Sequence, residues 1–220
     1  KTKKNLKNKS ISDSDAAQED QVTRIIAIAN QKGGVGKTTT SVNLAASLQA
    51  TKRRVLLVDM DPQGNATMGS GIDKGELEYS VYDVLMGESS FDQARVTAPE
   101  AEFDMLPANG DLVAAEIELL DMENRERRLK DMLASVADRY DFIVIDCPPS
   151  LNMLTLNALV AAQGVIIPMQ CEYYALEGLS ALVDTISAIS ATHNPELKIE
   201  GILRTMYDPR NKLTVEVSSQ

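Results

Sequence analysis

Short apolar runs rich in β-branched residues recur along the chain and predict buried strands. The first is residues 24–29, and the second is residues 54–59, which ends on an aspartate. Apolar runs of this length, without alternating polar residues, are typical of strands that are covered on both faces. Further runs occur at residues 103–107, where the pattern is weaker, and at residues 141–146, 164–168 and 197–203.

Segments with helical spacing separate these runs. Residues 38–50 and 175–192 each predict one helix, and residues 111–139 predict two, the second beginning near Asn124. A further helix is expected from about Asn211. Because strands that alternate with helices form βαβ units with right-handed crossovers, the pattern predicts an α/β fold. We expect a three-layer sandwich in which helices flank a mostly parallel sheet.

The composition agrees with this architecture, and the charge limits the classes of function that the protein can have. Hydrophobic residues make up 44% of the chain and aromatic residues only 4%, which favours an aliphatic core between a sheet and helices. The formal net charge of -10 argues against a surface that is basic throughout, although a local basic patch would still bind phosphates. No apolar run has the length of a transmembrane segment, and cysteines are few, so we expect a soluble, cytoplasmic protein.

The first residues differ from the rest. Residues 1–22 begin with a lysine-rich stretch and continue with Ser, Asp, Gln and Glu, with almost nothing apolar to bury. This composition predicts a disordered tail, for which contact with nucleic acid is the alternative role. We expect residues 23–220 to form the folded domain.

A glycine-rich loop connects the first predicted strand to the first predicted helix. Glycines allow successive N–H groups to face one concavity, and the helix N-terminus adds its dipole, so the loop predicts a phosphate site. In such a P-loop, Lys37 contacts the β- and γ-phosphates, and Thr38 offers its hydroxyl to Mg²⁺. The expected nucleotide-binding residues of the loop are Gly33, Gly34, Val35, Gly36, Lys37, Thr38 and Thr39.

Three acidic residues follow two of the predicted strands. Asp146 comes after four apolar residues, in the position of a Walker B acid that holds Mg²⁺. Asp59 and Asp61 lie in a turn-rich loop, from which an acid can orient the water that attacks the γ-phosphate. Ligands of parallel sheets bind beyond the carboxyl ends of the strands, so the acids and the P-loop should meet at one edge. Each acid alone could be a helix cap or turn former, but the set favours a catalytic site.

The combination of these segments resembles the deviant Walker ATPases, and among them the ParA/Soj type that segregates plasmids and chromosomes. The resemblance covers about residues 23–220 and implies the P-loop NTPase fold. It rests on residues 32–39, 58–65 and 143–150, with further similarity at residues 170–178 and 204–209.

The resemblance assigns roles to single residues. It implies that Lys32 is the family's signature lysine, which reaches the phosphates held by a second subunit in an ATP-dependent sandwich homodimer. It makes Asp61 the residue that positions water, while Asp59 supports Mg²⁺ and Met206 lies near the adenine. The expected catalytic residues are thus Lys32, Lys37 and Asp61, the expected metal residues are Thr38, Asp59 and Asp146, and the expected switch and dimer-interface residues are Pro148, Pro149, Glu172 and Tyr174.

The resemblance also implies a function. We expect an enzyme that hydrolyses ATP with Mg²⁺, binds double-stranded DNA without sequence preference, and segregates chromosomes or plasmids with a ParB-type DNA-binding partner. In the ATP-bound state it would associate with the nucleoid, and Arg204, Arg210 and Lys212 are the nearest basic cluster. ParA-type chains usually continue beyond the point that corresponds to Gln220 and, in the larger plasmid forms, begin with a winged-helix domain. We therefore expect a truncated C-terminus and no operator-specific repression.

Two alternatives stay open at this stage. A MinD-type membrane-cycling ATPase of cell division would need a C-terminal amphipathic helix. A reductase related to the nitrogenase iron protein would need two cysteines per subunit to share an iron–sulfur cluster, and Cys147 and Cys171 supply that number. Burial of thiols in the core explains these cysteines more simply. His193, the single histidine, lies in a polar turn and is expected at the surface.

Overall fold

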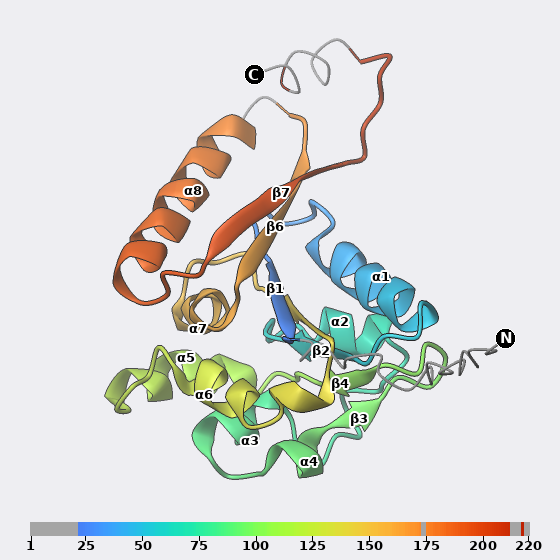
Figure 1. Cartoon of the computed structure of the whole chain (residues 1–220), viewed down its shortest axis with the longest axis vertical. Helices are drawn as coiled ribbons and strands as arrows, with labels where there is room; N and C mark the ends of the chain where they lie inside the picture. Colours follow the sequence, from blue (N-terminus) through green and yellow to red (C-terminus); the bar gives the residue numbers. More distant parts are fainter. Residues whose placement is uncertain (1–21, 173–174, 212–216, 218–220) are drawn as a thin grey trace, which may run out of the picture.

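One sheet organises the computed structural model, which describes residues 22–172, 175–211 and 217 (Figure 1). Within the described residues, seven strands pair in the order β3-β4-β2-β5-β1-β6-β7. All neighbours are parallel except β3 and β4. The strands are β1 (Arg24–Ile28), β2 (Val55–Asp59), β3 (Val96–Thr97), β4 (Asp104–Leu106), β5 (Phe142–Asp146), β6 (Gly164–Gln170) and β7 (Lys198–Thr205).

Helices cover both faces of this sheet. In Figure 1, α1 and α2 lie on one side of the sheet, whereas α7 and α8 lie on the other. The helices are α1 (Lys37–Ala50), α2 (Asn65–Gly69), α3 (Val81–Met86), α4 (Phe91–Ala94), α5 (Leu112–Glu118), α6 (Arg128–Ala134), α7 (Met153–Ala161) and α8 (Ala175–Thr192), with short 3₁₀ turns η1 (Leu119–Asp121) and η2 (Ala137–Arg139).

The strand pattern explains why both faces are covered. Side chains alternate between the two faces of a strand, so a strand that is apolar at every position needs a hydrophobic layer on each side. In β2, Val55 and Leu57 join the cluster on the α1 side, whereas Leu56 and Val58 join the larger cluster formed with α3, α5, α6, α7 and α8. All five β2 residues are buried. The three-layer α/β fold that the sequence predicts is therefore confirmed.

The predicted strands and long helices are present, with ends shifted by one or two residues at most positions. One helix boundary is wrong: the second helix of residues 111–139 begins at Arg128, not near Asn124. Asn124 has a φ of 53°, a left-handed conformation that interrupts a helix instead of starting one. The short elements α2, α3, α4 and β3, as well as α7, have no counterpart in the sequence analysis. The tail of residues 1–21 and the helix expected from about Asn211 lie outside the described residues, apart from Asn211 itself and Val217.

Candidate functional site

The P-loop joins β1 to α1 and ends on a left-handed glycine. Gly36 is the N-cap of α1 and has a φ of 88°, which a residue with a side chain rarely adopts. Thr205, the last residue of β7, holds the loop from outside, because its Oγ1 donates a hydrogen bond to the Val35 carbonyl at 2.8 Å. The end of the edge strand β7 is thus hydrogen-bonded to the P-loop. The sequence does not predict this contact.

Lys37 places a cation inside the loop. Its side chain is largely buried, and its Nζ donates a hydrogen bond to the Lys32 carbonyl at 3.0 Å. Burial lowers the pKa of Lys37, while the negative charges of Asp146 and Asp61 act in the opposite direction. The ammonium group is therefore held close to two carboxylates at the start of α1.

Asp146 lies beneath the first turn of α1, where two hydroxyls bind its carboxylate. Thr38 Oγ1 donates to Oδ2 at 2.8 Å, and Ser41 Oγ donates to Oδ1 at 2.7 Å. Burial raises the pKa of Asp146 to about 6, and the charge of Asp61 adds to this, whereas both hydroxyl donors and Lys37 oppose it. Ser41 is missing from the sequence prediction, although its position one helical turn after Lys37 is a signal that could have found it.

Asp59 stands beside Asp146, since the two residues are direct partners in the register of β2 and β5. Both are fully buried. Burial and the charge of Asp146 raise the pKa of Asp59 to about 7. Its Oδ2 accepts hydrogen bonds from the Thr67 amide at 2.9 Å and hydroxyl at 2.8 Å, and its Oδ1 accepts one from the Asp61 amide at 3.1 Å. Two neighbouring buried carboxylates repel each other when both are ionised, and a bound cation would reduce this repulsion.

The residues present fit a magnesium ion that keeps most of its water. No group of three or more His, Cys, Asp and Glu side chains forms a metal cluster in the described part of the chain. Mg²⁺ does not require such a cluster, because it commonly binds one or two carboxylates together with water and substrate phosphates. The hydrogen-bonded pair of Thr38 and Asp146 has this chemistry. Both oxygens of Asp59 accept hydrogen bonds from the protein, as do both oxygens of Asp146. The metal roles of Thr38, Asp59 and Asp146 stay predictions.

A cleft of about 550 Å³ opens above these groups. It brings together most of the predicted nucleotide residues, while Val35, Asp59 and Asp146 are buried below. Gln63, Asn65 and Pro149 also line it. Gln63 and Asn65 belong to the motif of residues 58–65, but the sequence analysis assigns no role to either side chain. The lining residues are Gly33, Gly34, Gly36, Lys37, Thr38, Thr39, Asp61, Gln63, Asn65, Pro149 and Met206.

Lys32 points elsewhere. Its Nζ forms an ion pair with Glu172, and both side chains are partly exposed. Asn30 fixes the backbone below, because its Oδ1 accepts a hydrogen bond from the Lys32 amide at 3.0 Å and its Nδ2 donates to the Pro168 carbonyl at 2.7 Å. Lys32 and Glu172, two residues predicted for contact with a second subunit, therefore meet each other here, and Tyr174 lies outside the described residues.

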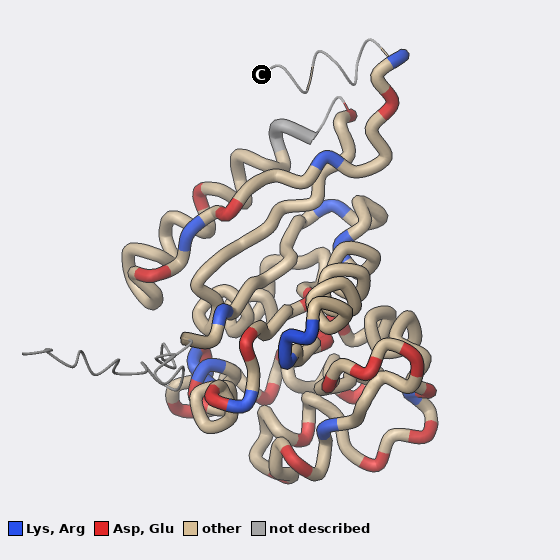
Figure 2. Tube along the Cα trace, turned by 45° about the vertical axis from the view of Figure 1, so that its right-hand side comes forward, with Lys and Arg blue, Asp and Glu red and all other residues tan. Residues whose placement is uncertain are grey.

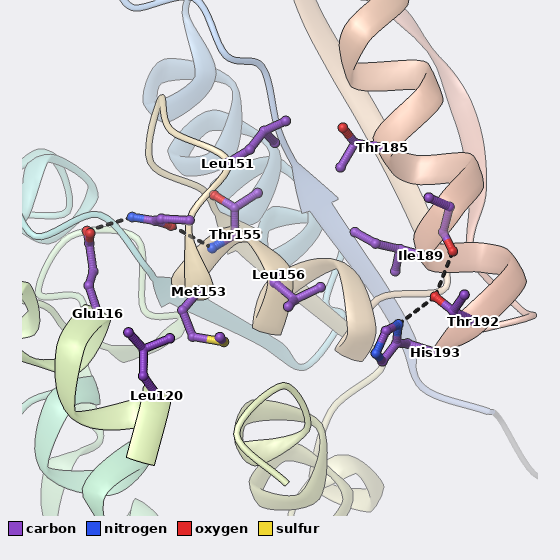
Figure 3. A pocket seen from close by; sticks show the side chains of 12 residues that line it. Glu116, Leu120, Leu151, Met153, Thr155, Leu156, Thr185, Ile189, Thr192 and His193 are labelled. Atoms are coloured by element: carbon purple, nitrogen blue, oxygen red, sulfur yellow. Dashed lines mark hydrogen bonds between the residues drawn. The ribbon is translucent and has the colours of Figure 1, made fainter. Parts of the chain in front are cut away.

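A second cavity, of about 530 Å³, lies between α5, α7 and α8 (Figure 3). No predicted site residue lines it. Its polar contacts belong to the fold: Asn152 caps α7 by accepting from the amides of Leu154 and Thr155, both at 3.1 Å, and donates to Glu116 at 2.6 Å. Most of the remaining wall is apolar and includes Leu120, Leu151, Met153, Leu156 and Ile189.

The single histidine and the two cysteines have structural positions. His193 is exposed at the end of α8, as predicted, and its Nδ1 lies 2.6 Å from Thr192 Oγ1. Cys147 and Cys171 are both buried free thiols. Burial and the neighbouring Asp146 raise the pKa of Cys147, which favours its thiol form. The description of both cysteines as core residues is thereby confirmed.

Together, the parallel helix-flanked sheet and the loop at its edge define a P-loop nucleotide-binding protein. Residues 23–199 match a family model described as an AAA domain. The chain belongs to the ParA/Soj family of partition ATPases, since it is similar throughout most of its length to members with those names. It is 53% identical to the chromosome partitioning protein ParA of Myxococcus xanthus, over 89% of this chain and 69% of that protein. It is 54% identical to the sporulation initiation inhibitor protein Soj of Bacillus subtilis, over 88% of this chain and 77% of that protein.

Solved structures agree with this placement. Cobyrinic acid a,c-diamide synthase from Mycobacterium smegmatis, with bound ATP analog and magnesium, has a TM-score of 0.87 and 46% identity, covering 90% of this chain and 81% of that one. A putative plasmid partition protein from Borrelia burgdorferi, bound to AMPPNP, has a TM-score of 0.77 and 30% identity, covering 90% and 79%. No helix in the described residues is both long and apolar enough to cross a membrane.

Proposed function

We propose that this chain is an ATP-dependent partition switch that binds ATP and Mg²⁺ in the P-loop cleft, dimerises around the nucleotide and then holds DNA. The observation that carries the proposal is the arrangement of Lys37, Thr38 and Asp146 at one edge of the sheet. A buried cation, a hydroxyl and a carboxylate at this edge are suited to a nucleoside triphosphate with its metal.

The residues of the cleft divide the work of hydrolysis. Lys37 neutralises the β- and γ-phosphates, while Thr38 and Asp146 hold the metal side of the nucleotide. Mg²⁺, when bound, neutralises charge on the phosphate oxygens. Asp61 lines the cleft and orients water toward the γ-phosphate. Phosphoryl transfer depends mostly on such positioning and charge neutralisation, so a strong base is not needed.

Lys32 acts between two subunits in this proposal. Its ion pair with Glu172 occupies the Lys32 ammonium group within one chain. Exposed ion pairs contribute little free energy, so ATP bound to a second copy can draw the lysine away from Glu172. A cation supplied by the partner subunit makes dimerisation depend on the nucleotide, as an arginine finger does.

DNA binding is the second half of the switch. Figure 2 shows acidic and basic residues together both around α3 to α6 and along β7 and the loop that follows. The basic residues at the end of β7 and just beyond it are the proposed DNA contacts. In this region Arg204 stacks on Tyr207, with 4.8 Å between the guanidinium carbon and the ring centroid, and Arg210 is exposed and pairs with Asp208. Lys212 lies outside the described residues. A dimer doubles any such basic surface, which supports DNA binding that requires ATP.

The relatives favour partition over the other named activity. The relatives called ParA and Soj share 53% and 54% of aligned residues with this chain, compared with 46% for the mycobacterial structure named as a cobyrinic acid a,c-diamide synthase. We therefore propose a ParB-type protein as the partner that triggers hydrolysis and release from DNA, with a chromosome or plasmid as the cargo.

Sedimentation and duplex-DNA titration, each with ATP and with ADP, test the proposal. The wild-type protein should dimerise with ATP only, and the ATP form should bind DNA without sequence preference and lose affinity steeply as salt rises. Lys32→Ala should bind ATP as a monomer, and Lys198→Ala, which removes an exposed lysine at the start of β7, serves as the charge-matched control. An ATP-bound dimer of Lys32→Ala contradicts the trans role. Preference for anionic lipid vesicles over DNA favours a MinD-type membrane cycle instead.

A further inference from the structure

A buried threonine joins two loops at the edge of the cleft. Thr67 lies in α2 and is fully buried. Its hydroxyl donates to Asp59 Oδ2 at 2.8 Å and accepts a hydrogen bond from the Ala108 amide at 2.9 Å. The hydroxyl thus donates its one hydrogen bond to one segment and accepts a hydrogen bond from another. The first segment contains Asp59 and Asp61, and the second is the loop that follows β4.

The same carboxylate reaches the residue that orients water. Asp59 Oδ1 accepts a hydrogen bond from the Asp61 amide at 3.1 Å, so a chain of hydrogen bonds runs from Ala108 through Thr67 and Asp59 to Asp61. The sheet brings the two loops together, because Val58 of β2 and Leu106 of β4 are register partners and both loops begin just after them. All of these contacts are made between groups of the protein itself.

The two loops also approach each other closely at Gly64. Gly64 has a φ of 62°, and a Cβ atom at this position would lie 2.7 Å from the Ala108 carbonyl oxygen. The turn itself is closed by a hydrogen bond from the Gly64 amide to the Asp61 carbonyl at 2.8 Å. Lys74 Nζ adds a hydrogen bond to the Gln63 carbonyl at 2.6 Å. The backbone that carries Asp61 is therefore fixed from several sides.

We propose that Thr67 is a positioning residue, which transmits the position of the loop after β4 to Asp61 and so sets the geometry for attack of water. The proposal rests on the ATPase function proposed above. Thr67 is fully buried and is not among the residues that line the cleft, so it acts through Asp59 and the Asp61 backbone. Since small displacements of an orienting group lower rates steeply, the effect should fall on kcat and not on the affinity for ATP.

The first test compares two replacements of Thr67. Thr67→Val keeps the shape and removes the hydroxyl, and we expect kcat to fall about 10- to 100-fold with the Kd for ATP within a factor of about two. Thr67→Ser restores the hydroxyl and should restore kcat. Ser70→Ala is the matched control, because the Ser70 hydroxyl is also buried but donates only to Ala66 of its own helix, at 2.8 Å. Wild-type kcat in Thr67→Val, or an equal loss in Ser70→Ala, overturns the proposal.

The second test separates the loops without touching Thr67. Gly64→Ala should reduce kcat with little change in ATP affinity, because the added methyl group meets the Ala108 carbonyl. Gly87→Ala is its control, since Gly87 also has a positive φ, of 82°, but a Cβ there meets no backbone atom within 4 Å. Wild-type kcat in Gly64→Ala, or the same loss in Gly87→Ala, counts against the coupling. This test decides the proposal if Thr67→Val does not fold.

Hydrogen exchange separates this inference from the proposed function. In Thr67→Val, and not in Thr67→Ser, the amides of Ala108 and Asp61 should exchange faster, because each depends on the chain of hydrogen bonds. Unchanged exchange at both amides in Thr67→Val overturns the inference even if the wild-type protein hydrolyses ATP. Absence of ATP hydrolysis in the wild-type protein overturns the proposed function, and exchange then still decides whether Thr67 couples the two loops.

Discussion

The nucleotide cleft and the cavity between α7 and α8 enclose similar volumes, about 550 and 530 Å³, but their walls have different chemistry. The cleft gathers left-handed glycines, a buried lysine and hydroxyls, above two carboxylates with raised pKa values. The cavity is lined mostly by leucine, isoleucine, methionine and threonine, and its charged Glu116 is bonded to the cap of α7. Volume alone therefore does not identify a functional site; convergent charges do.

The two regions also differ in how the fold builds them. Strand ends and one continuous loop supply most of the cleft, so its residues appear as motifs in the sequence. Three helices that are distant in the sequence supply the cavity, and its residues have no common spacing. If this contrast reflects function, substitutions in the cleft should change nucleotide chemistry, and substitutions in the cavity should change only stability.

The largest effect is expected for Asp61→Ala. If the Asp61 carboxylate orients water as proposed, its loss should reduce kcat roughly 100-fold or more, while nucleotide binding and the proposed ATP-bound dimer persist. Single-turnover hydrolysis and ATP affinity, measured on the same sample, test this. Asp73→Ala, which removes an acid on the neighbouring surface loop, is the control. Wild-type turnover in Asp61→Ala contradicts the assignment.

Lys37→Ala should act on binding instead. If Lys37 donates a hydrogen bond to the phosphates as proposed, removing its cation should weaken ATP affinity about 10- to 100-fold, since such a bond contributes roughly 1.5–3 kcal/mol. Titration with a fluorescent ATP analogue measures this, with Lys198→Ala as the charge-matched control. An ATP affinity equal to that of the wild type would remove Lys37 from the phosphate site.

The sequence predicts the residues that line the cleft better than it predicts the buried residues that hold them in place. Lys37, Thr38, Asp61 and Met206 line one cleft because a strand–loop–helix unit and parallel strand ends bring motif residues together. Thr67 could not be predicted, since its role depends on the register of β2 with β4 and on the short helix α2.

Short elements escaped the sequence analysis for a physical reason. The helices α2, α3 and α4 have four to six residues each, too few for a helical repeat of apolar positions to emerge. The helix predicted from near Asn124 begins only at Arg128, because asparagine tolerates the left-handed conformation that Asn124 adopts here. Long-range packing decides between such alternatives.

Magnesium-dependent binding should vary with pH. The pKa of Asp146 is raised to about 6, so its carboxyl group is mostly protonated below that pH and has lost the charge that favours Mg²⁺. The extra ATP affinity that Mg²⁺ provides should therefore rise from pH 5 to pH 7, by about tenfold at most for one such group. Titrations with Mg²⁺ and with a chelator, at each pH, isolate the metal-dependent part. Asp146→Asn should flatten this dependence, and an unchanged pH profile in that variant contradicts the metal role.

The smallest effect on nucleotide chemistry is expected in the apolar cavity. Ile189 is buried on α8 and lines the cavity, so Ile189→Ala should lower the free energy of unfolding by about 2 kcal/mol, because it removes apolar contacts at a site that is already partly open. Leu182→Ala, on the same helix but fully buried in the core, should cost more. Urea denaturation measures both, and ATP affinity should stay within a factor of about two in each folded variant. If Ile189→Ala weakens ATP binding as much as Lys37→Ala does, the two regions are coupled and the contrast between them fails.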